Sequence, residues 1–497
     1  MQYKTISLFL LFSTSCLAQQ LQPTTSKTIQ EKLNYFLQLT DSLRKIGQNP
    51  GLSMTIIYNN AIIYKKSVGL SNRKKKLKVT NNTLFEIGSL SKGFTGMLAA
   101  QLVDQNNFNW DDSVIKFLPE LRFKDDYATR NTTIKDLLTH KTGLFQHYHL
   151  LFGPKLSTEE ILKKLPFMSF GSTFREKFLY NNFTYVLAGM VLERATNKSF
   201  NKLLQENIFN KLSMLQTFSF YSASIQENQL AIGYLYDGKT PAPKPQKNSS
   251  TFSPAGSIIS SLNDMSTWLH ILLSHGKFKK ESIVSKKQFN YVISPLVVRN
   301  ALSQRFYGIG WDVIMREKYQ SISHDGVTDG HRSRILFVPE LGFGMVVLTN
   351  HNNVLPSMLT LLAERIFLQD SPTKTNDIFN YQKNNIDQSK HKKKHPVFTF
   401  NKPLFFKEHK GITGIYKHPA YGKLTLHLTP KKQIIFEYYG FKGSLKFEED
   451  ASIFAYVNHY LGKEKYEIKF HKDRSKNVQS ITVYMPNTLP LKFIKTP

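Results

Sequence analysis

Apolar residues near the N-terminus change their spacing from helical to alternating along the chain. Between residues 28 and 46 they recur every three or four positions, the interval that places side chains on one face of a helix. From 51 to 68 apolar and polar residues alternate, which is typical of paired strands, and Asn59-Asn60 predicts the turn between them. We therefore expect a helix followed by a β-hairpin.

The chain up to about residue 370 continues to mix strand-like and helix-like segments. An extended stretch at 83–87 precedes a helix-like run at 94–102, and the pattern stays mainly helical to about residue 290. Strand patterns then return at 308–313, 334–338 and 344–348, and a last helical segment follows at 355–368. This order predicts an α/β sandwich with a mostly antiparallel sheet and an inserted helical subdomain.

The C-terminal part of the chain has a different pattern. Residues 371–396 lack apolar periodicity and end in a run of lysines and histidines, which is typical of a linker. From 397 to 497 the chain is strand-like, with Gly and Asn marking turns, so we expect a small β-barrel or β-sandwich. The α/β domain is accordingly assigned to 19–370.

Residues 1–18 have the pattern of an export signal. Lys4 precedes an apolar core and a run of small residues, and we expect cleavage after Ala18 and a periplasmic or secreted protein. Lipid attachment at Cys16 is the alternative. Cys16 is the sole cysteine, so cleavage leaves no thiol for disulfides, for a cysteine nucleophile or for a cysteine metal site.

The charge balance is strongly basic. Sixty-six Lys and Arg against 36 Asp and Glu give a net charge of +30, which favours association with anionic surfaces. A general lysine bias explains the same balance, because the basic residues are spread along the chain and form no nucleic-acid-binding module. We expect no nucleic-acid partner. No apolar run reaches the roughly 18 residues of a membrane-spanning helix, so none is expected.

Candidate chemistry begins at Ser89-Leu90-Ser91-Lys92, where an extended segment enters a helix-like run. Residues three positions apart share a helix face, so Lys92 should lie beside the hydroxyl of Ser89. A serine becomes a nucleophile when a neighbour removes its proton; Lys92 can be that base or can supply a charge that favours another base. The spacing recurs by chance in this lysine-rich chain, but the extended segment before Ser89 and the apolar helix-like run after it separate this match from the others.

Two further segments carry candidate site residues. Tyr180 can relay a proton when a cation stabilises its phenolate, and Asn182 offers an amide to a substrate or to Lys92. Taken alone, the segment is explained more simply by a buried tyrosine beside a helix-capping asparagine. At 324–327, Gly326 lets a substrate approach the backbone and the amide of Val327 can form an oxyanion hole with that of Ser89. An ordinary turn before a strand is the alternative there.

Taken in order, Phe85 to Lys92, Tyr180-x-Asn182 and His324-x-Gly326 resemble the three signature elements of the serine β-lactamase and penicillin-binding protein family. The similarity is greatest to class C β-lactamases and their esterase and D-peptidase relatives. Supporting segments that also match lie at 137–144, 253–257, 307–311 and 346–350. The resemblance covers about residues 30–370 and implies that family's α/β fold and an acyl-enzyme mechanism; the C-terminal β domain is similar to those appended to such hydrolases.

The chain departs from the β-lactamases at the third element. Lys141-Thr142-Gly143 spells a common form of it, but precedes Tyr180 and matches a structural segment of the family. His324 therefore stands where β-lactamases carry lysine, and a histidine near neutral pH is mostly uncharged. Arg332 or Arg334 could restore a cation for a substrate carboxylate, or be surface charge.

These features predict an exported serine hydrolase that cleaves an ester or amide through an acyl-enzyme at Ser89. Lys92 and Tyr180 would manage the proton, while Asn182, His324, Gly326 and Val327 would bind substrate. An esterase or D-peptidase acting on a small molecule or peptide, for instance one derived from the cell wall, is favoured over an efficient β-lactamase. The alternative is a non-catalytic peptidoglycan- or partner-binding protein. No cofactor and no metal are expected.

Overall fold

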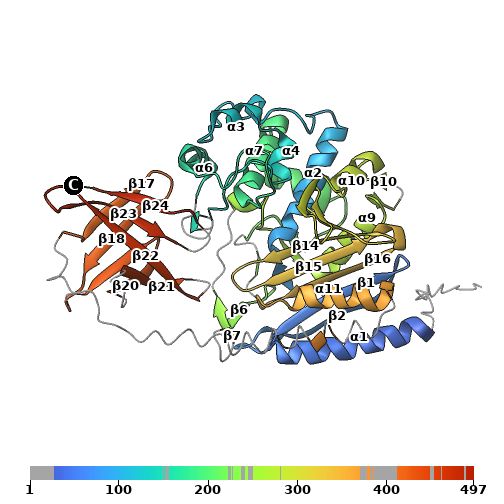
Figure 1. Cartoon of the computed structure of the whole chain (residues 1–497). Coiled ribbons are helices and arrows are strands. Elements are labelled where there is room, and N and C mark those ends of the chain that lie inside the picture. The colour runs from blue at the N-terminus through green and yellow to red at the C-terminus, as the bar shows by residue number, and fades with distance from the viewer. Residues whose placement is uncertain are drawn as a thin grey trace, which may run out of the picture.

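The computed structural model describes residues 27–369 and 411–496, except for short gaps inside both ranges, and a few isolated residues between them. The predicted export signal at 1–18, with Cys16, and most of the predicted linker at 371–396 lie outside the described residues. Figure 1 shows an α/β domain with a β-barrel beside it.

A single antiparallel sheet forms the centre of the α/β domain. Its strand order in the described residues is β11-β12-β13-β14-β15-β16-β1-β2-β3, and each neighbouring pair is antiparallel. The bounds are β1 Gly51–Tyr58, β2 Ala61–Asn72, β3 Leu77–Lys78, β11 Val297–Asn300, β12 Arg305–Tyr307, β13 Asp312–Met315, β14 Gln320–Val327, β15 Arg332–Val338 and β16 Phe343–Thr349. The predicted antiparallel α/β sandwich is confirmed.

The first hairpin has the turn that the sequence predicts. Asn59 and Asn60 connect β1 to β2 with φ angles of 49° and 61°. Two left-handed residues in a two-residue turn match the right-handed twist of the strands, and asparagine tolerates that conformation well.

Helices cover both faces of the sheet. Figure 1 shows α1 (Lys27–Ile46) and α11 (Leu355–Glu364) side by side along one face, where they bury an apolar layer with β1, β15 and β16. The opposite face packs against a larger core that includes α2 (Ser91–Asp104), α9 (Leu262–Leu273) and α10 (Lys286–Val292). Helix α2, which directly follows the candidate nucleophile Ser89, thus lies on this second face.

The inserted region is mainly helical, as expected, with short strands at its edges. Its other helices are α3 Asp126–Asn131, α4 Ile134–Leu138, α6 Thr158–Lys164, α7 Asn182–Thr196 and α8 Phe200–Leu204. Its short strands are β4 Leu84–Glu86, β5 Thr217–Phe218, β6 Gly233–Tyr236, β7 Pro241–Lys244, β8 Ile259–Ser261, β9 Lys277–Phe278 and β10 Glu281–Ser282.

The strand expected at 308–313 is wrong over its first four residues. Residues 308–311 instead turn between β12 and β13. Gly310 has a φ of 83° and lies so close to α2 that a Cβ atom would be 2.4 Å from the carbonyl oxygen of Lys92. A Cβ on Gly93 would be equally close, 2.4 Å, to the ring of Trp311. Close packing against α2, which periodicity cannot reveal, therefore bends the chain.

The C-terminal domain is a closed barrel of eight antiparallel strands within the described residues. The strands are β17 Gly414–His418, β18 Gly422–Leu428, β19 Ile434–Tyr438, β20 Phe441–Phe447, β21 Ile453–His459, β22 Gly462–Lys472, β23 Val478–Tyr484 and β24 Leu491–Lys495. Closure removes the exposed edges that an open sheet would present. Of the two architectures that the sequence left open, the barrel is the one that forms.

Polar contacts join the barrel to the α/β domain. The hydroxyl of Tyr421 donates to Nδ1 of His147 over 2.7 Å, because Nε2 of that histidine donates to the carbonyl of Ser169 over 2.9 Å. Nζ of Lys164 donates to the carbonyl of Ala420 over 2.8 Å. The barrel thus rests on the segment around residue 147 and on α6.

Candidate active site

Ser89 lies where strand β4 ends and helix α2 is about to begin. It belongs to the 3₁₀ turn η1 (Gly88–Leu90), which runs directly into α2, and Lys92 lies in the first turn of α2. Nζ of Lys92 is 3.2 Å from Oγ of Ser89, as their spacing predicts. The hydroxyl is partly exposed and the lysine is fully buried, so a substrate can reach the serine but not the amine.

The amine of Lys92 is surrounded by neutral groups. Besides the Ser89 hydroxyl, Nζ donates to Oδ1 of Asn182 and to the carbonyl oxygen of Ala255, each over 2.6 Å. None of these three partners carries a negative charge. Burial therefore lowers the pKa of Lys92 well below its usual value, because nothing offsets the loss of hydration. A lysine in this state can serve as a proton acceptor.

Asn181 and Asn182 divide two roles between them. Asn181 is the N-cap of α7: its Oδ1 accepts from the backbone amide of Phe183 over 2.8 Å, and its Nδ2 donates to the carbonyls of Leu144 and Phe145. Asn182 is the first residue of α7 and holds Lys92. The helix-capping role that the sequence left open for Asn182 therefore belongs to its neighbour, Asn181.

Tyr180 lies against the other side of the amine. Nζ of Lys92 is 4.8 Å from the centroid of the Tyr180 ring, within the range of a cation–π contact when the lysine is charged. The ring of Tyr180 also lies 6.2 Å from that of His324. The structure therefore brings Ser89, Lys92, Tyr180, Asn182 and His324 into one neighbourhood.

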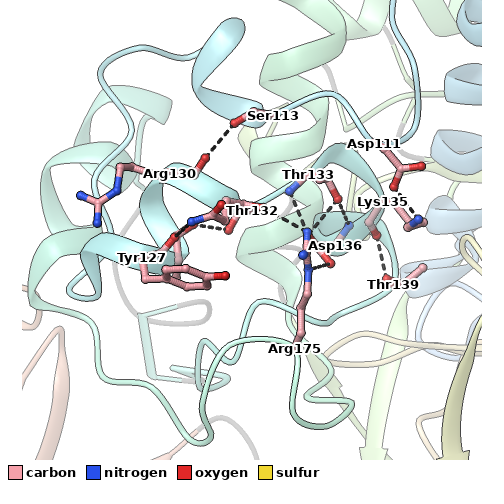
Figure 2. Close-up of polar contacts among 12 residues, drawn as sticks. Asp111, Ser113, Tyr127, Arg130, Thr132, Thr133, Lys135, Asp136, Thr139 and Arg175 are labelled. Carbon is pink, nitrogen blue, oxygen red and sulfur yellow. Dashed lines mark hydrogen bonds and ion pairs between the residues drawn. The ribbon is translucent and has the colours of Figure 1, made fainter.

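A polar brace fixes the segment that leads to Tyr180 (Figure 2). Figure 2 shows Arg175 directed at Asp136, with Nη2 to Oδ2 at 2.6 Å, and Asp136 also accepts from the amide and hydroxyl of Thr133. The backbone amide of Arg175 donates to the carbonyl of Lys141 over 2.9 Å. This brace holds the chain before Tyr180 against the end of α4.

His140 completes the floor of the site and has no assigned role in the sequence prediction. Its Nδ1 accepts from the backbone amide of Asn181 over 3.0 Å, and its ring lies 4.5 Å from that of Tyr180 and 5.1 Å from those of Tyr185 and Tyr307. Burial, with the charge of Lys92 adding to it, lowers the pKa of His140 well below the usual value. The ring is therefore a neutral packing and orienting group.

Strand β14 places Gly326 and Val327 directly against the turn that carries Ser89. A Cβ atom on Gly88, whose φ is 53°, would lie 2.6 Å from the backbone nitrogen of Val327. A Cβ on Gly326 would lie 1.9 Å from the carbonyl oxygen of Ile87. Only glycine fits at both positions. The contact brings the amide of Val327 to the turn of Ser89, the arrangement that a two-amide oxyanion hole requires.

His324 is buried and neutral. Its Nδ1 donates to the carbonyl of Asp325 over 2.7 Å, so Nε2 is left to accept from the hydroxyl of Tyr307 at 3.1 Å. Burial lowers its pKa to about 4, although Asp312 opposes the shift. His324 therefore offers a polar edge, and not a positive charge, at neutral pH.

Sequence reasoning missed the aromatic wall that surrounds these groups. The ring of Phe178 lies 5.1 Å from that of Tyr307 and 5.4 Å from that of His140. Tyr307 could have been predicted as a site residue, because it lies in a segment that resembles the family. No feature of the sequence marks Phe178. The wall combines side chains from segments that only tertiary packing brings together.

Within the described ranges no group of three or more histidine, aspartate, glutamate or cysteine side chains is arranged to hold a metal ion. The helices in those ranges also include none with the length and apolar character needed to cross a membrane.

A buried lysine beside a serine at a helix start, on an antiparallel α/β fold, defines a serine hydrolase class. The family model described as Beta-lactamase matches residues 36–366. The chain therefore belongs to the beta-lactamase family of serine hydrolases. The resemblance inferred from the sequence motifs is confirmed.

Similar proteins include hydrolases and penicillin-binding protein homologues. The chain is 27% identical over 413 residues to the unguisins hydrolase ungD′ of Aspergillus campestris, covering 78% of this chain and 76% of that protein. It is 27% identical over 311 residues to Protein flp of Staphylococcus aureus, covering 62% and 61%. The octameric penicillin-binding protein homologue from Pyrococcus abyssi superposes with a TM-score of 0.61 at 20% identity, over 93% of this chain and all of that one, which shows a shared fold.

Proposed function

We propose that the protein is an exported serine hydrolase that cleaves an ester or an amide through an acyl-enzyme on Ser89. The observation that carries the proposal is the 3.2 Å contact between Nζ of Lys92 and Oγ of Ser89, made by a buried amine with no carboxylate partner among the atoms it contacts. Export rests on the sequence pattern of residues 1–18 alone.

In the proposed reaction, Oγ of Ser89 attacks the substrate carbonyl. The serine proton moves to the neutral amine of Lys92 or to the phenolate oxygen of Tyr180. The developing oxyanion accepts from the amides of Ser89 and Val327. The carbonyl carbon then loses the alcohol or amine, which takes up the proton, and Ser89 carries the acyl group. Water attacks this ester by the reverse proton path, releasing the acid and restoring the hydroxyl.

Esters and D-peptides are better candidate substrates than β-lactams. The observation behind this preference is His324, which stands where β-lactamases of the resembling class carry lysine and whose burial keeps its pKa at about 4. Without a permanent cation at this position, recognition of the β-lactam carboxylate is weakened. Hydrolysis in general is supported by the similarity to the unguisins hydrolase ungD′. The fold shared with a penicillin-binding protein homologue is consistent with it.

Covalent labelling tests the proposal directly. The purified protein is incubated with a fluorophosphonate and, separately, with a fluorescent penicillin, and the adduct is mapped by mass spectrometry. We expect a fluorophosphonate adduct on Ser89, hydrolysis of p-nitrophenyl acetate, and loss of both in Ser89→Ala. Ser42→Ala, an exposed serine on α1 with a lysine at the same spacing, is the matched control for the labelled position. A correctly folded protein with no adduct and no turnover would favour the non-catalytic binding protein.

A further inference from the structure

A buried acid and a buried histidine lie behind the candidate oxyanion hole and have no part in the proposed reaction. Glu86 is the last residue of β4 and is 7% exposed, and His331 directly precedes β15 and is 1% exposed. Nδ1 of His331 lies 3.4 Å from Oε2 of Glu86, within ion-pair range although no standard hydrogen bond reaches it from the described residues. Charged side chains are almost never fully buried unless they are paired, so the two have to be considered together.

The contacts of His331 determine where its protons are. Nε2 lies 3.1 Å from the carbonyl oxygen of Ala231, which only accepts hydrogen bonds, so Nε2 carries a proton. In a neutral ring Nδ1 would then present a lone pair to the carboxylate of Glu86. A second proton, on Nδ1, removes this repulsion and makes the contact an ion pair. Burial by itself would raise the pKa of Glu86, but the interactions with His331 and with the hydroxyl of Thr328 lower it below its usual value, which keeps the carboxylate charged.

The pair joins the two segments that carry the amides of the candidate oxyanion hole. Glu86 precedes Ser89 by three residues, and His331 ends the turn that begins just after Val327. In that turn the amide of Thr328 donates to the carbonyl of His331 over 3.0 Å, and the amide of His331 donates to the hydroxyl of Thr328 over 3.2 Å. Both bonds close the turn, so the position of His331 limits the position of Val327.

The remaining contacts of His331 lead to the same short strand. Ala231, which accepts from Nε2, donates its own amide to the carbonyl of Leu84 in β4 over 2.9 Å. The imidazole ring also packs edge-on against the ring of Phe85, with centroids 6.0 Å apart. His331 therefore holds β4 directly through two side chains and indirectly through the backbone of Ala231. Strand β4 is the segment that leads to the candidate nucleophile.

We propose that the pair of Glu86 and His331 positions the oxyanion hole by holding the turn after Val327 against the strand that leads to the nucleophile. Donors that are already in place need no reorganisation when the oxyanion forms, so a small displacement of one amide lowers the rate. Neither side chain touches the substrate in this role. The inference rests on the proposed hydrolase activity and adds the groups that orient its oxyanion hole.

The test separates positioning from stability. Glu86→Leu removes the carboxylate, and Glu86→Leu/His331→Phe replaces the whole pair by apolar side chains of similar shape, a change that often preserves stability. We expect both to lower kcat for p-nitrophenyl acetate by about tenfold or more with KM within about twofold, because acylation and deacylation both pass through an oxyanion. The double variant should nevertheless melt closer to the wild-type temperature than Glu86→Leu does, since it leaves no buried group unpaired.

A boronic acid provides a second measurement, because its tetrahedral adduct on Ser89 places an oxygen in the oxyanion hole. The inhibition constant of phenylboronic acid should rise in both variants by about the factor by which kcat falls.

Glu86→Gln is the conservative variant. Its amide can donate to Nδ1 of a neutral His331 and so retain the contact without charge. We expect this variant to keep kcat within about threefold of the wild type.

Glu364→Leu is the matched control. Glu364 is a buried acid in α11, 1% exposed and paired with Arg316 over 2.9 Å, and α11 covers the face of the sheet opposite α2. Loss of this pair should lower the melting temperature but leave kcat and the inhibition constant of phenylboronic acid within about twofold.

Two outcomes overturn the inference. The first is wild-type kcat in the folded double variant, which would mean that the pair contributes stability alone. The second is an equal fall of kcat in Glu86→Leu and Glu364→Leu at a temperature where both are folded. Either leaves Ser89-dependent hydrolysis by the wild type intact. Absence of all Ser89-dependent labelling and hydrolysis in the wild type would instead remove the proposed function and this inference with it.

Discussion

At the scale of single residues, the chemistry depends on how Lys92 is solvated. Its three polar contacts are neutral oxygens, and burial lowers its pKa well below the usual value. His324 and His140, two titratable groups on which its charge acts, also have pKa values lowered by burial. The site is therefore built from groups that favour their uncharged forms, which suits proton transfer at neutral pH.

Substituting Lys92 tests this electrostatic argument. Arginine retains a cation but cannot be deprotonated in a protein, so Lys92→Arg should lower kcat for p-nitrophenyl acetate by about 100-fold or more. Lys92→Met, which has similar length and no charge, should lose activity to a similar extent. The wild-type kcat/KM should rise with pH as Lys92 loses its proton, at a pH below the usual lysine range.

The controls for this prediction are the melting temperatures of both variants and labelling of Ser89. A folded Lys92→Arg protein with wild-type kcat would mean that the lysine acts as a fixed charge and that another group accepts the proton. That alternative was left open by the sequence.

At the scale of elements, the site depends on the tight contact between η1 and β14. Gly88 and Gly326 leave no room for a side chain, and the hydroxyl of Ser333 on β15 donates to the carbonyl of Ile87 over 2.7 Å. The turn that bears Ser89 is therefore fastened to the sheet from two neighbouring strands. This contact places the amide of Val327 where an oxyanion could form.

Gly326→Ala should separate these elements. The added Cβ would lie 1.9 Å from the carbonyl oxygen of Ile87, so the turn must shift away from β14. We expect kcat to fall by about 100-fold, the effect of losing one oxyanion donor, with a loss of about 1–3 kcal/mol in the free energy of unfolding. Kinetics and urea denaturation measure the two effects.

Gly256→Ala is the matched control, because its Cβ would face the same turn but have its nearest contact at an ordinary 3.7 Å, from Gly88. It should change both quantities little. Equal losses in the two variants would argue against a specific role for the contact between η1 and β14.

At the scale of the whole molecule, the barrel rests on the α/β domain through groups that can gain charge. Burial lowers the pKa of His147 and of His418 to about 4, from a usual value of 6.5. The charge of Lys164 also lowers the pKa of His418, and the charge of His418 lowers that of His147. Protonation would therefore bring three cations together at the contact between the domains.

Acid should destabilise the folded chain for this reason. Between pH 6.5 and 4 these histidines are protonated in the unfolded state but stay neutral in the folded state. The free energy of unfolding therefore falls as the pH falls through this window. Differential scanning calorimetry should show a lower melting temperature near pH 5 than near pH 7.5. The double variant His147→Gln/His418→Gln should show a smaller fall, although His140 and His324 still contribute. An unchanged pH dependence in that variant would contradict the assignment to this interface.

The sequence by itself determined the features that depend on neighbouring residues. The asparagine turn of the first hairpin, the spacing of Ser89 and Lys92 and the alternation of the barrel strands follow from periodicity and local geometry. The order of three motifs was sufficient to indicate the family. Arg332 and Arg334 show the limit, because both were reasonable cations by proximity to His324 in sequence. Both instead pair with Asp325, whose side chain points to the opposite face of the sheet from that of His324.

Only the tertiary structure decided which groups meet. Asn181 caps α7 while Asn182 holds Lys92, a division that depends on how α7 docks against α2. His140 packs against Tyr180 because its Nδ1 accepts from the backbone amide of Asn181, 41 residues further along the chain. Such contacts join residues far apart in the chain, and their geometry is set by packing, register and burial, which no local pattern encodes.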